Sequence, residues 1–197
     1  MTEGRARAPM AERAGPLTIV VGLGSNVEPD RHLPEAVRLL AERAEIVGAS
    51  SAWATAPVGP PGQPPFVNAA VLLRTHLAPD RVKPELLRSV EAAMGRVRGP
   101  DRFAPRPIDL DFVASDGGEL RGDGLEVPDP DLLRHAHVAL PAAEVAAEWK
   151  HPQTGETFAA IAARLVADLP EAERPRRLDL ALRRLRETSS PDNTKAG

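Results

Sequence analysis

The stretch Arg106-Pro107-Ile108-Asp109-Leu110-Asp111-Phe112 alternates apolar and acidic side chains with the period of a β-strand. Side chains two residues apart share a face, so the apolar residues are expected to face the core, with Asp109 and Asp111 side by side opposite. Adjacent carboxylates repel each other, and Mg²⁺ commonly binds one or two carboxylates together with water and phosphate oxygens. The pattern predicts a strand over residues 107–114 that carries a magnesium site, although two solvated acids on an edge strand would show the same spacing.

A loop rich in arginine, glycine and proline comes directly before this strand. It carries four arginines within eleven residues: Arg96, Arg98, Arg102 and Arg106. A guanidinium group is always charged and offers a planar fork that fits phosphate oxygens. Arginines beside paired acids are typical of enzymes that transfer phosphate groups from a nucleoside triphosphate. The alternative is a solvated basic loop whose arginines form salt bridges with the acids.

A second loop, over residues 56–65, holds five prolines and two glycines, too many for a helix or a central strand. The strand expected after it begins near Phe66 and Asn68. The Asn68 amide offers both a donor and an acceptor, which suits a flat heterocycle with a mixed polar edge. Phe66 lies two residues away on the same face and could stack on that ring. The alternative is that Phe66 belongs to the core and Asn68 serves as a strand-end hydrogen bonder.

Hydrophobic periodicity elsewhere predicts alternating strands and helices. The main strands are expected over residues 17–23, 46–54, 66–75 and 107–114, and the main helices over 30–44 and 79–94. This β-α-β-β-α-β order is that of the split βαβ plan, an antiparallel α+β sheet with two helices on one face. Residues 22–26 are expected to form a turn. Later in the chain we expect short strands at 125–127 and 138–140, and helices at 141–147, 157–166 and 178–185.

Composition limits the remaining possibilities. With 197 residues and 42% apolar content, the chain suits one well-buried domain over residues 17–169. Residues 1–16 are expected to be a disordered tail, and residues 170–197 a charged extension, partly helical or disordered. The net charge of −3 disfavours nucleic-acid binding, and the lack of cysteine excludes thiolate chemistry. No apolar stretch approaches a membrane span, so we expect a soluble, cytoplasmic monomer whose partners are small molecules.

Together these blocks resemble the 6-hydroxymethyl-7,8-dihydropterin pyrophosphokinase family of folate biosynthesis, in order from about Thr18 to Val166. The matching motifs are Gly24-Ser25-Asn26, Gln63-Pro64 through Asn68, Glu91 before Gly95-Arg96-Val97-Arg98, Arg102, Pro105-Arg106 before Ile108-Asp109-Leu110-Asp111, and Val127-Pro128. The resemblance implies a ferredoxin-like fold, ATP as the donor, two Mg²⁺ ions, and AMP and the pterin diphosphate as products.

The resemblance also implies a role for each matching residue. Asp109 and Asp111 would bind both metal ions, and Asp111 could help to take the proton from the attacking hydroxyl group. The residues expected to bind ATP are Glu91, Arg96, Arg98, Arg106 and Phe112, of which Arg96 and Arg106 are also catalytic. Those expected to bind the pterin are Thr55, Ala56, Val58, Phe66, Asn68 and His137.

Three residues depart from the family pattern within a short segment. Asp129 stands where the family has histidine, His135 where it usually has arginine, and His137 where it has an aromatic wall for the pterin. Asp129 replaces a donor near the phosphates with an acceptor-only anion, which should weaken ATP binding. The departures leave three alternatives open: a catalytically impaired paralogue, an enzyme for a related heterocyclic alcohol, or a new metal or acid–base site.

Overall fold

The structure is a computed structural model that describes residues 15–55, 64–96, 105–122, 124–180 and 182. Its centre is a six-stranded sheet in which every pairing is antiparallel. The strands are β1 (Leu17–Ser25), β2 (Glu45–Ala49), β3 (Ala52–Thr55), β4 (Phe66–Thr75), β5 (Asp109–Ser115) and β8 (Arg176–Leu178). Their order is β5-β1-β4-β3-β8, and β2 also pairs with β4. The β-α-β-β-α-β order predicted from the sequence is confirmed.

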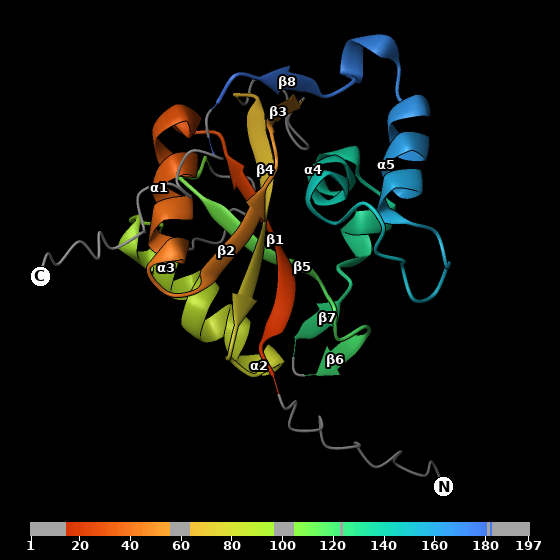
Figure 1. The fold of residues 1–197 in the computed structure, drawn as a ribbon. Coiled ribbons are helices and arrows are strands. Elements are labelled where there is room, and N and C mark those ends of the chain that lie inside the picture. Colours follow the sequence, from red (N-terminus) through yellow and green to blue (C-terminus); the bar gives the residue numbers. More distant parts are fainter. Residues whose placement is uncertain (1–14, 56–63, 97–104, 123, 181, 183–197) are drawn as a thin grey trace, which may run out of the picture.

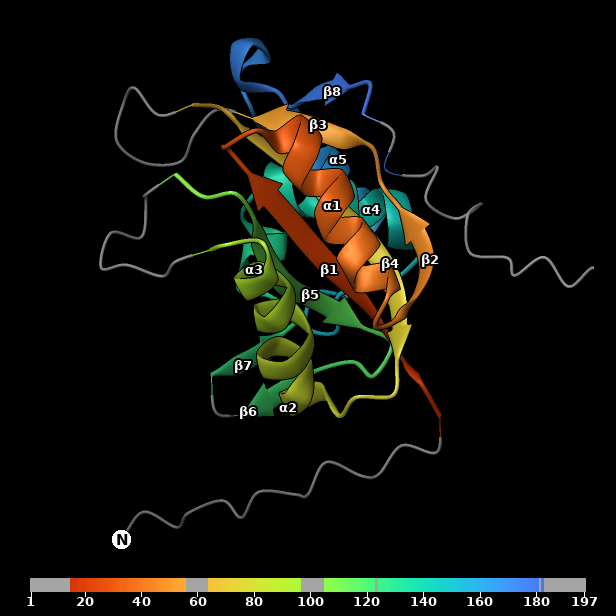
Figure 2. The same cartoon turned by 90° about the vertical axis from the view of Figure 1, so that its left-hand side faces the viewer.

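Helices cover both faces of this sheet (Figures 1 and 2). One face carries α1 (Pro29–Ala41) and a continuous helical segment made of α2 (Pro79–Arg81), a π-helical stretch (Val82–Leu87) and α3 (Arg88–Ala93). The opposite face carries α4 (Ala136–Ala146) and α5 (Phe158–Ala167). The prediction of two helices on one face is therefore correct for the first pair and incomplete for the domain. The later helices add a second covering layer and a second core.

Strand alternation divides the apolar residues between these two cores. In β1, Ile19, Val21 and Leu23 face the α1 and α3 side, whereas Val20 faces α4 and α5.

A two-stranded sheet of β6 (Leu120–Gly122) and β7 (Leu125–Val127) lies next to β5, and short 3₁₀ helices span Pro130–Leu133 and Glu171–Glu173. No described helix is long and apolar enough to cross a membrane.

Several boundaries differ from the sequence-based expectations. The strand expected over 46–54 is two strands, because the chain is interrupted at Ser50 and Ser51 between β2 and β3. Residues 138–140, predicted as a strand, belong to α4, because a short apolar run does not distinguish a strand from a segment of a buried helix. β1 continues to Ser25, so the two glycines expected in a turn lie inside a strand.

The C-terminal extension also differs from its prediction. Residues 176–178 form β8, which pairs with β3 rather than joining a helix or a disordered tail. Leu182 is only 2% exposed and packs into the core on the α1 side. The prediction missed this strand because its hydrogen-bonding partner is more than 120 residues earlier in the chain.

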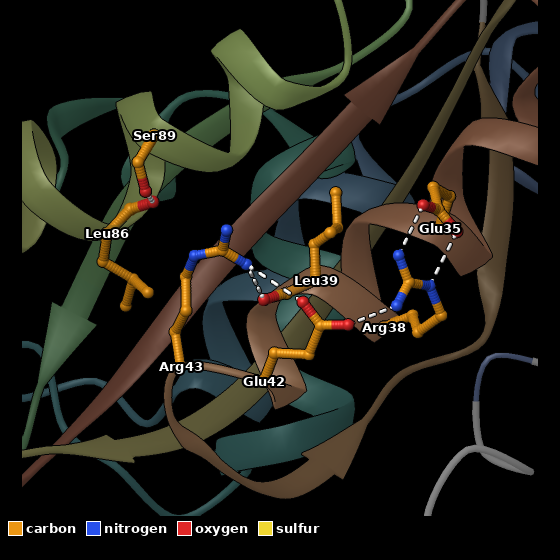
Figure 3. A network of polar contacts seen from close by, with 7 residues as sticks. All are labelled: Glu35, Arg38, Leu39, Glu42, Arg43, Leu86 and Ser89. Carbon is orange, nitrogen blue, oxygen red and sulfur yellow. Dashed lines mark hydrogen bonds and ion pairs between the residues drawn. The ribbon is translucent and has the colours of Figure 1, made fainter.

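The outer surface of α1 carries a chain of exposed ion pairs (Figure 3). Arg38 donates to both oxygens of Glu35, at 2.8 and 2.9 Å, and pairs with Glu42 on its other side. Exposed ion pairs of this kind contribute little to stability, because water screens the charges. They indicate that the outer face of α1 is solvated.

Candidate active site

Two glycines in β1 form the floor of a cleft on the α4 side of the sheet. Gly24 is paired with Asn68 on β4 and with Asp109 on β5, and Gly22 is paired with Asp111. A Cβ atom on Gly24 would lie 3.2 Å from the Asn68 Oδ1 atom, and one on Gly22 would lie 3.1 Å from a Val113 methyl group. Side chains at these positions would fill the space between Asn68, which is expected to hydrogen-bond the heterocycle, and the paired acids. Glycines within a strand mark such close approaches, a signal that could have identified both residues.

The cleft has a volume of about 490 Å³, within the range typical of small-molecule sites. Seven of the predicted site residues line it: Thr55, Phe66, Asn68, Arg106, Asp109, Asp111 and His137. They come from β3, β4, β5, the segment before β5 and the start of α4. The sequence therefore predicted seven of the sixteen lining residues as site residues, and it missed the glycine floor and Asp131, which lies at the same cleft.

The two acids of β5 share one face, as the strand period predicted, and both line the cleft. Asp109 forms ion pairs with Arg96 and with Arg106, the latter at 2.5 Å between Nη1 and Oδ2. Burial, together with the charge of Asp109, raises the pKa of Asp111 to about 6. Since a cation close to both groups would favour their charged forms, the pair fits a divalent metal ion. The salt-bridge alternative is correct in part for Asp109, but the cleft in front of the acids stays open.

Asp109 and Asp111 would supply only two protein ligands to a metal ion. Among the described residues no group of three or more histidine, cysteine, aspartate or glutamate side chains could hold a metal ion. Two carboxylates with water and phosphate oxygens are the usual magnesium set in nucleotide-using enzymes. The same finding gives no support to a new metal site made of Asp129, His135 and His137.

Three residues expected to bind ATP, Glu91, Arg96 and Phe112, are not among those that line the cleft. Glu91 is 2% exposed, pairs with Arg96 and accepts the Leu110 N–H at 3.0 Å, so it positions Arg96 and β5 from behind. Phe112 is 2% exposed and belongs to the core on the α1 and α3 side. Its side chain therefore lies in the core and not at the cleft, because strand alternation turns it away from both acids. Arg98 falls outside the described residues.

The heterocycle side of the cleft is built by β3 and β4. The Asn68 Nδ2 atom donates to the Thr55 hydroxyl at 2.8 Å, which fixes the orientation of the amide. Phe66 is on the same face, and the guanidinium of Arg106 lies 5.5 Å from its ring centre. The predicted pterin-binding positions Ala56 and Val58 fall outside the described residues.

The start of α4 closes the cleft with two histidines. The rings of His135 and His137 stack at 5.1 Å between centroids. Burial, helped by His135, lowers the pKa of His137 to about 4, so its ring is neutral near pH 7. Asp129 accepts the Asp131 N–H at 2.9 Å, and burial raises the pKa of its carboxyl group. The cleft thus offers a neutral aromatic surface beside an acidic one.

The cleft combines paired acids and neighbouring arginines with a polar and aromatic end, on a split βαβ sheet. This combination defines a class: enzymes that transfer phosphate groups from a nucleotide to a small heterocycle. The comparisons then specify the family. The sequence model of 7,8-dihydro-6-hydroxymethylpterin-pyrophosphokinase (HPPK) matches residues 20–147, and the chain belongs to this family.

Named relatives agree with this assignment. The chain is 36% identical over 145 residues to a 2-amino-4-hydroxy-6-hydroxymethyldihydropteridine pyrophosphokinase of Synechocystis sp., covering 71% of each chain. It is 38% identical over 129 residues to the protein of the same name from Methylorubrum extorquens, covering 64% of this chain and 80% of that one.

Solved structures support the fold. A crystal structure of Plasmodium falciparum HPPK-DHPS matches with a TM-score of 0.60 at 13% identity, over 82% of this chain and 47% of that one. The chain therefore spans about half of that protein. At this identity the match concerns the fold alone, and it confirms the ferredoxin-like α+β prediction.

Proposed function

We propose that this cleft transfers a diphosphate from ATP to the hydroxymethyl group of 6-hydroxymethyl-7,8-dihydropterin, giving AMP and the pterin diphosphate. Membership of the family makes the chain a pyrophosphokinase of folate biosynthesis with ATP as co-substrate. The observation that supports the site assignment is the strand register that places Asn68 and Asp109 on either side of Gly24. A pterin read by Asn68 would then present its hydroxymethyl group towards the acids.

The phosphate half of the proposal rests on the face of β5 that carries Asp109 and Asp111. Asp109 and Asp111 would hold magnesium, and the resemblance implies two ions. Bound magnesium neutralises the charge of the triphosphate. Arg96 and Arg106, now paired with Asp109, would turn to the phosphate oxygens. Glu91 keeps Arg96 close to the site from its buried position.

The transfer itself needs little covalent chemistry from the protein. The hydroxymethyl oxygen bonds to the β-phosphorus while the bond to the AMP oxygen breaks, and Asp111 helps to accept the hydroxyl proton. Phe66 and the neutral His137 ring would hold the pterin between them, with Thr55 and Asn68 at its polar edge. We also propose that the enzyme acts as a monomer in the cytoplasm, where ATP is supplied.

The test is AMP release from ATP, magnesium and the hydroxymethyl dihydropterin. We expect the Asp109→Ala Asp111→Ala double variant to lose at least about 10³-fold in kcat, because the phosphate charge is no longer neutralised. Asp168→Ala, an exposed carboxylate at the end of α5, is the matched control and should keep full activity. Equal turnover in the wild type and the double variant would defeat the proposal, whereas pterin binding without AMP formation would favour the impaired paralogue.

A further inference from the structure

Helix α4 connects the cleft to a distant corner of the sheet. His137, near its start, lines the cleft, and Glu144 follows seven residues later. Seven residues make about two helical turns, so both side chains lie on the same side of the helix. The helix lies against β4 and β3 (Figure 1), and Glu144 is an exposed residue near its end. The position of the His137 wall therefore depends on how the far end of α4 is attached.

Glu144 makes that attachment with both carboxylate oxygens. Its Oε2 atom accepts the backbone N–H of Ser51 at 2.7 Å, and its Oε1 atom accepts the indole N–H of Trp53 at 2.9 Å. Hydrogen bonds to a charged acceptor are stronger than neutral ones, and two of them fix orientation as well as distance. Arg177 on β8 donates to the Ser51 hydroxyl at 2.9 Å, which holds the same corner from the opposite side.

The attached strand, β3, carries Thr55 at the polar edge of the heterocycle pocket. Trp53 is paired with Asn68 across the β3–β4 ladder. Thr55, two residues after Trp53 on the same face, accepts the Asn68 amide N–H. The carboxylate of Glu144 thus connects the helix that carries the His137 wall to β3, and β3 pairs with β4, the strand of Phe66 and Asn68.

We propose that Glu144 is a positioning residue that sets the width of the pterin half of the cleft. It does not line the cleft and acts through Ser51 and Trp53. The phosphate half is built by β5 and the segment before it, at the other edge of the sheet from β3. Glu144 should therefore affect pterin binding and leave ATP binding unchanged. The inference rests on the proposed function, because it names the pterin as the ligand.

The first experiment compares Glu144→Ala with Glu148→Ala, since both carboxylates are exposed near the end of α4 and it is Glu144 that accepts from Ser51 and Trp53. We expect the KM for the dihydropterin to rise about five- to tenfold in Glu144→Ala, with the KM for ATP within about twofold. Glu148→Ala should match the wild type, and Glu144→Gln, which keeps one acceptor, should be intermediate. A parallel rise in both KM values, or equal behaviour of the two alanine variants, would overturn the proposal.

A double-mutant cycle with Trp53→Phe isolates the proposed path, because phenylalanine keeps an aromatic ring but lacks the N–H donor. The combined variant should be less impaired than the two separate losses multiplied together. Fully multiplicative effects would show that Glu144 and Trp53 act independently and would contradict the proposal.

A ligand-free measurement separates this proposal from the assigned reaction. In NMR spectra of the apoprotein, Glu144→Ala should shift the Trp53 indole and the Asn68 side-chain amide resonances, whereas Glu148→Ala should shift neither. If the wild type bound no pterin, the proposed function would fail while these shifts still supported the link. Unchanged Asn68 resonances in Glu144→Ala would refute the link itself.

Discussion

Asp129 is the residue that most distinguishes this site, because it adds a further aspartate to the cleft in which we propose that the triphosphate binds. It lines the cleft together with Asp109 and Asp111, and burial raises its pKa. Its carboxylate also caps the following 3₁₀ helix through the Asp131 N–H. The residue therefore combines a structural role with an electrostatic cost to ATP binding.

Asp129→Asn separates these two roles, because asparagine keeps the capping acceptor and removes the charge. We expect the KM for ATP to fall about three- to tenfold, since a like charge beside the phosphates is removed. The KM for the dihydropterin should not change. Steady-state kinetics with each substrate varied in turn tests this, and an increased KM for ATP would show that the carboxylate assists binding.

His137 should make the protein sensitive to acid. The pKa of its ring is lowered to about 4 in the folded chain, below the ordinary value of 6.5, so the unfolded chain binds the proton more readily. Stability is then full above about pH 6.5 and decreases as pH falls towards 4, by about 1–3 kcal/mol. His137→Phe removes this contribution and keeps an aromatic wall.

Urea unfolding at pH 7.5 and pH 4.5 checks the effect. The loss of stability between these two values should be smaller in His137→Phe than in the wild type, and His76→Phe, at a site before α2, serves as control. The same pH dependence in wild type and His137→Phe would assign the acid sensitivity to other groups.

At the level of elements, the sheet owes one edge to a strand from the C-terminal extension. β8 pairs with β3, and Leu182 just beyond it is buried among the residues packed around α1. An isolated three-residue strand contributes little alone, so the buried leucine is what fixes it to the core. The last described residues are therefore part of the folded domain.

Leu182→Ala should lower the free energy of unfolding by about 2–4 kcal/mol, because it removes a buried side chain and leaves a cavity. Leu180→Ala, at a partly buried position nearby, should cost clearly less. Urea denaturation measures both. A neutral Leu182→Ala would mean that this segment frays in solution, as composition alone suggested.

For the whole molecule, the proposal of a monomeric enzyme is open to a direct test. We expect the 21.0 kDa chain to be monomeric and active at nanomolar concentration. Light scattering after gel filtration gives the mass, and a specific activity that falls on dilution would indicate an obligate oligomer.

The sequence determined what depends on local period and chemistry. The alternation around Asp109 and Asp111 was enough to place both acids on one face, and the same period correctly brought Phe66 and Asn68 together. The helices expected over 79–94 and 157–166 end and begin close to those bounds, with Gly95 at a positive φ of 77° after the first and the Thr157 hydroxyl capping the second.

Only the tertiary structure decided which of these local features meet. The register of β1 with β4 and β5 made Gly24 the floor between Asn68 and Asp109, and alternation across a strand turned Phe112 away from the site. The link from Glu144 to Ser51 and Trp53 joins residues more than 90 positions apart. Strand pairing and helix docking depend on partners that are distant in the chain, and a local sequence pattern does not specify which distant segments will pair.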